Sequence, residues 1–391
     1  MYHKYYIVKC YSDNFELNYK YLEEHLKKLN IKPDENAIDI IKILDLEEFN
    51  KKNVKIEKYC EYSSIIRLPQ FNKNIFTADV FFLSGNNSTN RRFYNFQKYL
   101  VNISNLQETK HITNKKMIIN EIDKINPNIV KKYIPETFNI SQINKYEFPK
   151  WYIIRPIDSF SGEGIKYINN LEDLNEAIEY YNITKNYKNI NYGNNVIASE
   201  YISNPLLFKS KKFHLRLYYV ISLINDTFNT FLWNIGKIMT AEKPFDMNIP
   251  FTKDKHDTHL KSTDDDYFYP KDFNKNLNKK INIEDDKIIY NKIKLICKAI
   301  SQVIKKSKSK LLYPNEKNMY HLFGLDIMVR DNLEPVFIEL NEQPGLNCLS
   351  TIKCDNFSKE YFQWINDIIL EPLFKYNDPM IARKHHTYID I

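Results

Sequence analysis

Two carboxylates and an amide occur, near the C-terminus, at spacings that would bring their oxygens together. The segment 323–346 contains two apolar runs joined by a short polar turn. If these runs form a symmetric hairpin, Asp326 lies across from Glu339, and strand alternation puts Asn341 on the same face as Glu339. Like charges so close repel, so the pattern favours a cation between them, with Mg²⁺ as the natural candidate for oxygen ligands. The alternative is an ordinary hairpin whose acids face water.

Three basic side chains alternate with apolar ones further upstream. In the run 212–217, a period of two puts Lys212, His214 and Arg216 on one face of a strand. Such a row of cations on a half-buried strand favours a bound anion such as phosphate. The alternative is an edge strand with a basic outer face.

A third segment combines a cation with a glycine-containing loop. Arg155 ends a short apolar run, and Ser161, Gly162 and Gly164 follow in a loop before Ile165 begins a second run. Backbone N–H groups of such a loop can bind phosphate oxygens while Arg155 reaches them from the strand end. The alternative is a plain hairpin turn, because a lone Gly-x-Gly is not specific.

A fourth segment has the character of a hinge. Ser199, Glu200, Tyr201 and Ile202 end a β-branched strand that runs into a bend at Pro205. Backbone groups at such a bend can bind the edge of an adenine ring. Without the other segments this would be an ordinary strand.

Composition limits the classes of protein and partner. The net charge of +7 and pI near 8.8 suit an acidic partner, such as a nucleotide or an acidic polypeptide. The basic residues are dispersed, which does not favour nucleic acid. Five cysteines without a CxxC pair favour a reducing, cytoplasmic setting and argue against a zinc site. No stretch approaches a membrane span, so we expect no membrane partner.

The length of 391 residues predicts two or three domains. We expect a small α/β unit over 1–105, a central subdomain over 106–202 and a C-terminal subdomain over 203–391. Within the last, 242–285 is rich in Lys, Asp and Asn and has little periodicity, which predicts a long, partly mobile insertion. An amphipathic stripe over 286–306 predicts a long helix.

Taken in order, these segments resemble the tubulin–tyrosine ligase-like family of ATP-grasp ligases over about residues 115–372. The most specific match is to the family's F-G-x-D…E-x-N-x-x-P-x-L signature, at 323–326 and 339–346. Three further elements are similar in kind and order: the W-I-x-K-P…G-x-G-I element, the hinge and the K-F-D-L-R strand, at 151–165, 198–207 and 212–216.

The resemblance implies an α+β fold of the ATP-grasp type, in which two α+β subdomains clamp ATP, beside the small N-terminal α/β unit. It implies ATP-dependent joining of an amino acid to a protein carboxylate through an acyl-phosphate, on tubulin or another acidic tail. Mg²⁺ would be held by Asp326, Glu339 and Asn341, while Arg216 and Lys212 would steady the phosphates. Nucleotide contacts are implied at Arg155, Ser161, Gly162, Gly164, Ile165, Ser199, Glu200, Tyr201, Ile202, Lys212 and His214.

Several substitutions separate this chain from the family pattern. Arg155 stands where a Lys is usual, His214 replaces an Asp and Ser199 a Gln. Met239 stands in place of an Arg, which Lys237 could replace only with a shift of register. In the family's H-L-T-N element, residues 259–262 have Lys and Ser instead of Thr and Asn.

We therefore expect ATP and metal binding to be retained, whereas the amino acid, Glu, Gly or Tyr, is left open. Two other functions stay open. One is an ATP-grasp kinase of a polyanionic small molecule such as an inositol phosphate, and the other is a non-catalytic nucleotide-binding relative.

Overall fold

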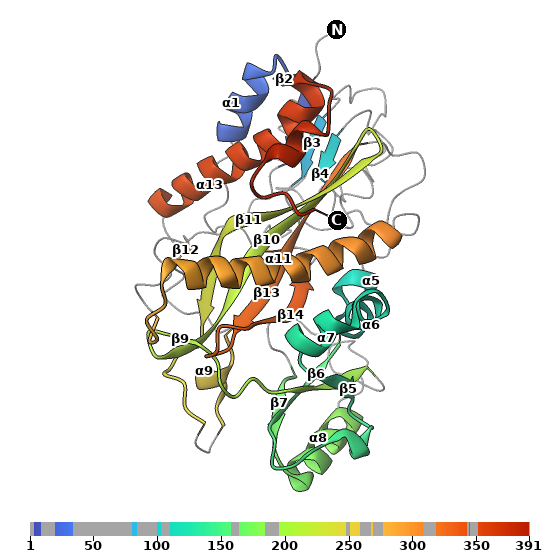
Figure 1. Ribbon diagram of the computed structural model, residues 1–391, viewed down its shortest axis with the longest axis vertical. Helices are drawn as coiled ribbons and strands as arrows, with labels where there is room; N and C mark the ends of the chain where they lie inside the picture. Colours follow the sequence, from blue (N-terminus) through green and yellow to red (C-terminus); the bar gives the residue numbers. More distant parts are fainter. Residues whose placement is uncertain are drawn as a thin grey trace, which may run out of the picture.

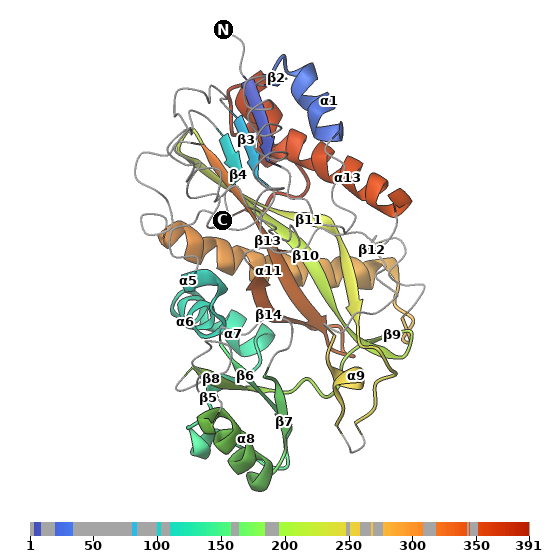
Figure 2. The ribbon, with the colours of Figure 1, turned by 180° about the vertical axis from the view of Figure 1, so that it is seen from behind.

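The structure is a computed structural model, and it contains two sheets with helices packed on them (Figures 1 and 2). It describes residues 4–8, 20–33, 80–83, 100–102, 110–157, 164–183, 195–247, 251–258, 267–268, 277–307, 318–341, 344 and 351–390. None of the helices in these ranges combines the length and the apolar character needed to cross a membrane.

The larger sheet is built around the long strands β10 (Lys211–Ile224), β11 (Thr227–Thr240) and β13 (Met319–Val329), which pair antiparallel. The short strand β14 (Pro335–Asn341) also pairs with β13. Along the same edge of β13, away from β10, the sheet continues with parallel pairings through β4 (Leu100–Asn102), β3 (Val80–Leu83), β1 (Lys4–Val8) and β2 (Lys32–Pro33). Strands from the first 102 residues thus extend the sheet that contains the acidic hairpin, and the division into three domains stays a prediction.

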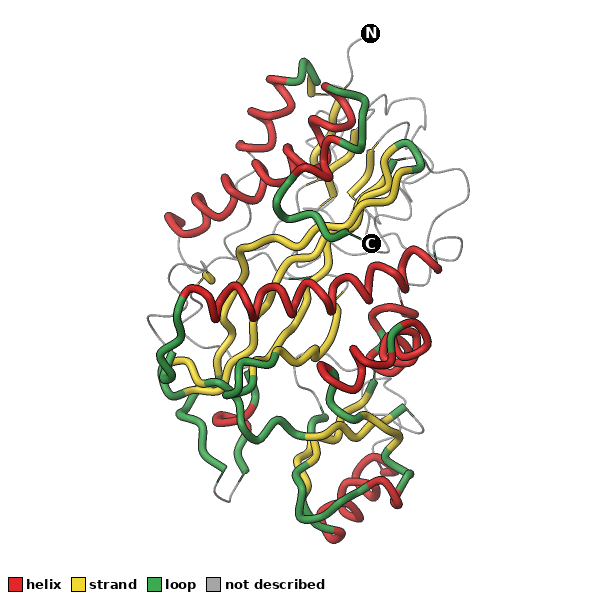
Figure 3. Tube along the Cα trace, viewed as in Figure 1, coloured by secondary structure: helices red, strands yellow, loops and turns green. Residues whose placement is uncertain are grey.

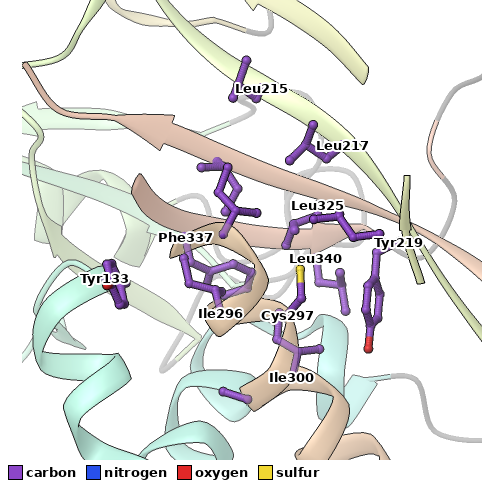
Figure 4. Packing of buried hydrophobic residues seen from close by; sticks show 14 of the residues in the cluster. Tyr133, Leu215, Leu217, Tyr219, Ile296, Cys297, Ile300, Leu325, Phe337 and Leu340 are labelled. Carbon is purple, nitrogen blue, oxygen red and sulfur yellow. The ribbon is translucent and has the colours of Figure 1, made fainter. Parts of the chain in front are cut away.

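One face of this sheet is covered by α11 (Ile283–Lys306), which crosses the long strands (Figure 1). Leu215, Leu217 and Tyr219 of β10 pack in one buried cluster with Ile296 and Ile300 of α11 (Figure 4). The predicted helix is confirmed and begins three residues earlier, at a capping box formed by Asn282 and Asp285. Three short helices join the same cluster: α5 (Lys110–Thr113), α6 (Lys115–Ile125) and α7 (Pro127–Tyr133).

The opposite face is covered by α1 (Lys20–Lys28) and α13 (Thr351–Ile365), which continues as a π-helix over Asn366–Lys375. Tyr218 and Val220 of β10 lie in this second cluster, where the rings of Trp233 and Trp364 stack at 5.3 Å. Alternate residues of β10 therefore belong to two cores, so most of this strand is buried on both faces.

The smaller sheet has the order β5-β8-β6-β7 and lies at one end of the molecule (Figure 3). Its strands are β5 (Thr137–Asn139), β8 (Val196–Glu200), β6 (Tyr152–Pro156) and β7 (Lys166–Ile168), and α8 (Leu171–Ile183) packs on it. All its pairings are antiparallel. Helices packed on a largely antiparallel larger sheet, with parallel pairings only toward β2, and on an antiparallel smaller sheet agree with the predicted α+β class.

One of the alternatives is contradicted, and part of the predicted insertion lies in the described residues. The strand with the basic face, β10, lies between β11 and β13, so the alternative of an edge strand is wrong. Within 242–285, the structure describes a short helix α9 (Lys253–His256) and β12 (Tyr267–Phe268). Residues 256–258 are buried there, so this described part is packed rather than loose. Polar contacts and ring stacking hold it, and neither requires an apolar period.

Candidate active site

The hairpin of β13 and β14 brings the two predicted acids together. Asp326 pairs with Glu339, as predicted, and Gly324 with Asn341. The register shifts next to Asp326, because Ile327 pairs with Phe337. Without this bulge Asp326 would face residue 338, so the bulge rather than hairpin symmetry places the two carboxylates opposite each other. Bulges commonly redirect side chains beside active sites.

Asn341 links the two acids. Its Nδ2 atom donates to Asp326 Oδ2 at 3.0 Å and to Glu339 Oε1 at 3.1 Å. The amide nitrogen therefore stands between the carboxylates, where a cation would lie, and turning the amide would present its oxygen instead.

No group of three or more His, Cys, Asp or Glu side chains with a metal-binding arrangement occurs in the described ranges. The set of two carboxylates and one amide suits a hard cation such as Mg²⁺, which usually takes its other ligands from water and substrate phosphates. The residues present therefore fit the implied metal.

Cationic side chains surround both acids. Lys115 Nζ lies 3.1 Å from Glu339 Oε2, and Arg155 Nη1 lies 4.0 Å from the same oxygen. Arg216 donates through both Nε and Nη2 to Asp326, the latter at 2.9 Å. These three cations face two carboxylates, so the site has cationic charge to offer a polyanion as well.

Burial affects the two arginines differently. Burial lowers the pKa of Arg155 and the nearby Glu339 opposes this shift. For Arg216, burial also acts against the charged form, but the paired Asp326 outweighs it and raises the pKa above its ordinary value. Within the described residues, Arg155 Nε is buried without a hydrogen-bond acceptor. A phosphate oxygen would satisfy it, because buried donors are normally paired.

Lys212, His214 and Arg216 share one face of β10, as predicted, and their contacts differ. Lys212 Nζ donates to the carbonyl oxygen of Ile202 at 3.4 Å and lies 3.7 Å from the ring centre of Tyr201. Burial lowers the pKa of Lys212 to about 7, against the effect of the Asp257 carboxylate. His214 Nδ1 lies 2.6 Å from Thr258 Oγ1, and its Nε2 lies 3.7 Å from Asp326 Oδ2.

Gly324 explains how Arg216 reaches its partner. A Cβ atom at position 324 would lie 2.8 Å from Pro344 Cβ and 3.0 Å from Arg216 Cδ. Contacts of this kind would force the arginine to shift. Glycine at this position thus leaves space for Arg216 to lie across the strand toward Asp326.

An aromatic cluster adjoins the hinge and was not predicted. Tyr201 Oη and His256 Nδ1 lie 2.7 Å apart. The ring of Phe251 stacks on His256 at 3.5 Å and on Trp151 at 4.3 Å, and Tyr167 is 4.8 Å away. Burial, aided by Lys212 and Lys255, lowers the pKa of His256 to about 4, so its ring is neutral near pH 7. This cluster joins the small sheet to the segment that follows β11.

Other predicted positions are placed less directly. Ser199 Oγ is buried and lies 2.9 Å from Thr137 Oγ1, and Glu200 pairs with Lys150 at 3.5 Å. Both side chains thus bond within the small sheet, so any nucleotide contact there would use the backbone. Gly164 has a φ of 72°, which favours glycine. Ile165 follows it and precedes β7. Ser161, Gly162 and 259–262 lie outside the described residues.

The register between β10 and β11 gives the positions of Met239 and Lys237, which were compared with the family's arginine. Met239 pairs with His214, and Lys237 pairs with Arg216. Both therefore lie on the face of β11 that adjoins the cationic row, without a shift of register. Lys115 was missed as a site residue. Its position in the first turn of α6 after the Asn114 cap was predictable, but its pairing with Glu339 depends on tertiary packing.

Comparison with known proteins agrees with this geometry. The profile of the Tubulin-tyrosine ligase family matches residues 87–360. Human "Tubulin polyglutamylase TTLL5" is 24% identical over 216 residues, which is 50% of this chain and 16% of that protein. Human "Probable tubulin polyglutamylase TTLL2" is 24% identical over 255 residues, 62% of this chain and 38% of that protein. The chain thus spans well under half the length of these relatives.

A solved structure shows the fold. The C-terminal domain of Pby1 from K. lactis, described as an ATP-grasp enzyme that interacts with the mRNA decapping enzyme Dcp2, superposes with a TM-score of 0.58. At 17% identity, the match covers 99% of this chain and 97% of that one. The chain has an α+β fold of the ATP-grasp type and belongs to the tubulin-tyrosine ligase family.

Proposed function

We propose that this protein is an ATP- and Mg²⁺-dependent ligase that joins an amino acid to a carboxylate of an acidic protein, with glutamate and tubulin as the first candidates. The observation that carries this proposal is the meeting of Asp326, Glu339 and Asn341 with the cations of β10 and with Arg155. Such a site offers oxygen ligands to a metal and, beside them, positive charge to phosphates.

The choice of co-substrate and acceptor rests on two further observations. Relatives that match this chain are named as tubulin polyglutamylases, which favours glutamate among the three amino acids considered. The net charge of +7 suits an acidic acceptor tail.

Each residue of the site has a part in the proposed reaction. When bound, Mg²⁺ would supply charge neutralisation for the phosphates, and Asp326, Glu339 and Asn341 would hold it. Arg216 would stabilise charge on the transferred phosphoryl group and on the acyl-phosphate that the acceptor carboxylate forms. Lys212 and Arg155 would bind the phosphates of ATP, and Lys115 would keep Glu339 oriented through their ion pair. The amine of the amino acid would then displace phosphate from the acyl-phosphate.

A labelling experiment tests the proposal. The protein is incubated with Mg-ATP, tubulin and labelled glutamate, glycine or tyrosine in parallel, and label on tubulin is measured. We expect incorporation of glutamate, and a loss of at least about 100-fold in Asp326→Asn, because the change removes a metal ligand's charge. Asp331→Asn is the matched control, because Asp331 lies exposed in the turn of the same hairpin and bonds Asn204 at 3.0 Å.

Two results would refute this function. Transfer of label from γ-labelled ATP to an inositol phosphate, without amino-acid incorporation, would favour the kinase. Nucleotide binding without any ADP formation, with tubulin and each amino acid present, would favour a non-catalytic role.

A further inference from the structure

The segment 251–258 places three consecutive polar side chains against residues of the proposed nucleotide site. His256, Asp257 and Thr258 are only 3%, 5% and 3% exposed. His256 bonds Tyr201, and Thr258 bonds His214. Buried polar groups persist where they are paired, so these polar contacts dock the segment together with the ring stacking of Phe251. Thr258, the last described residue of the segment, contacts His214, which in turn lies beside Asp326.

The contact between Thr258 and His214 decides which ring nitrogen carries the proton. Thr258 Oγ1 lies 2.6 Å from His214 Nδ1, and a hydroxyl can either donate or accept at that distance. If the hydroxyl donates, Nε2 carries the N–H, and the nearby Asp326 Oδ2 lies 3.7 Å from this nitrogen. If the hydroxyl accepts, the lone pair of a neutral ring faces a carboxylate, which is repulsive. For a neutral ring, electrostatics therefore select Thr258 as the donor.

The separation of His214 from Asp326 also has a consequence. At 3.7 Å, Nε2 is beyond ordinary hydrogen-bond distance, so it attracts the carboxylate without occupying a lone pair. Asp326 Oδ2 already accepts from Arg216 Nη2 at 2.9 Å and from Asn341 Nδ2 at 3.0 Å. An N–H on the third side would fix the orientation of the carboxylate while leaving it able to bind a cation. Partners of metal-binding side chains act in this way and affect metal affinity.

We propose that Thr258 is a positioning residue: it holds His214 in the tautomer that presents Nε2–H to Asp326 and so orients this carboxylate for the metal. The inference rests on the proposed function to the extent that Asp326 is taken as a metal ligand. It assigns a role in metal binding to the segment after β11.

Metal affinity is the first measurement. Mn²⁺ replaces Mg²⁺, and its binding to the protein with a non-hydrolysable ATP analogue is followed by electron paramagnetic resonance. Thr258→Val keeps the shape and removes the hydroxyl, and we expect Mn²⁺ affinity about 10-fold weaker. Thr258→Ser restores the hydroxyl, and we expect affinity within about threefold of the wild type. Affinity for the analogue without metal should change little in both variants.

Thr252→Val is the matched control. Thr252 lies in the same segment, and its hydroxyl donates to Asp254 rather than to a residue of the site. We expect its Mn²⁺ affinity to stay within about twofold of the wild type. An unchanged Mn²⁺ affinity in Thr258→Val, or an Mn²⁺ affinity of Thr258→Ser as weak as that of Thr258→Val, would overturn this inference and leave the proposed function intact. Failure of the wild-type protein to bind Mn²⁺ with the analogue would overturn the inference together with the proposed function.

The tautomer is measured without metal or nucleotide. Nitrogen-15 labelling of the histidines, with long-range proton–nitrogen correlation spectra, distinguishes Nε2–H from Nδ1–H, and His214→Gln identifies the signal of His214. We expect the Nε2–H tautomer in the wild type and a mixture in Thr258→Val. The Nδ1–H tautomer in the wild type would overturn the inference, whether or not Thr258→Val folds.

Discussion

The acidic hairpin and the segment 251–258 both contact β10 at the proposed site, but different forces hold them in place. The hairpin is fixed by a continuous backbone ladder from β10 through β13 to β14 and by ion pairs of Arg216 and Lys115. The segment has the four-residue helix α9 and no strand ladder. It is held mainly by ring stacking, side-chain hydrogen bonds and ion pairs.

This difference separates two tasks. Most of the groups proposed to bind metal and phosphate lie on strands, where many backbone hydrogen bonds together resist small displacements. The segment contacts those groups from outside through single side chains, each of which can be changed alone. Substitutions of the hairpin residues that face the proposed site should therefore abolish activity, whereas substitutions in the segment should alter affinity or stability by smaller steps.

The largest effect is expected for Glu339→Gln. The change keeps the shape, removes the charge that Lys115 and Arg155 face at 3.1 and 4.0 Å, and removes a predicted metal ligand. Mutating a residue that only hydrogen-bonds to a metal ligand typically lowers activity by roughly 10- to 100-fold. We expect ligase turnover of Glu339→Gln to fall by more than this, while the protein keeps a cooperative unfolding transition. Turnover is measured as ADP release with saturating acceptor.

Glu334→Gln is the control for this change, because Glu334 belongs to the same hairpin and pairs with Lys292 at 2.7 Å. It should leave turnover unchanged. A fully active Glu339→Gln would remove Glu339 from the metal site and would erase the contrast between the hairpin and the segment.

Much of the fold followed from periodicity, and the exceptions have a physical cause. The helix predicted at 286–306 forms at Ile283–Lys306, and the hairpin predicted within 323–346 forms from β13 and β14. The strand β11 (Thr227–Thr240) was not predicted, although it is one of the two longest in the described ranges. Most of β11 is buried on both faces, so its sequence does not alternate between polar and apolar.

The site residues also divide into those that a local sequence pattern predicts and those that it does not. The pairing of Asp326 with Glu339 was predictable because both lie in one hairpin, and the shared face of Lys212, His214 and Arg216 needs only a strand period. The ion pair of Lys115 with Glu339 joins residues more than 200 positions apart, which no local pattern reveals. His256, Asp257 and Thr258 occur within a Lys-, Asp- and Asn-rich stretch, where buried polar residues look like exposed ones until their partners are known.

A pH effect of intermediate size is expected at Lys212. Its pKa in the free protein is lowered to about 7 by burial, and bound phosphates would raise it, so the lysine takes up a proton when ATP binds. Affinity should then fall as pH rises above 7, by up to about 10-fold for each unit of pH until the pKa of the complex is reached. The dissociation constant of ATP is measured by fluorescence titration without metal from pH 6.5 to 9.

Lys212→Arg is the control, since arginine stays charged over this range. The ratio of the two dissociation constants cancels the titration of ATP itself. The wild-type dissociation constant divided by that of Lys212→Arg should rise above pH 7. A value of this ratio that does not depend on pH would show that Lys212 does not gain a proton on binding.

The smallest effect is expected for Phe251→Leu, at the contact between the segment and the small sheet. Leucine keeps apolar surface but loses the stacking of Phe251 on Trp151 and His256, at 4.3 and 3.5 Å. We expect the free energy of unfolding in urea to fall by about 1 kcal/mol, while the dissociation constant of ATP changes by less than about twofold. Phe228→Leu, a partly buried ring at the far end of β11, is the control for losing an aromatic side chain. A tenfold weaker ATP affinity of Phe251→Leu with unchanged stability would place the aromatic part of the segment in the nucleotide site. The contrast between the acidic hairpin, which binds the reactants, and the segment 251–258, which supports it, would then no longer hold.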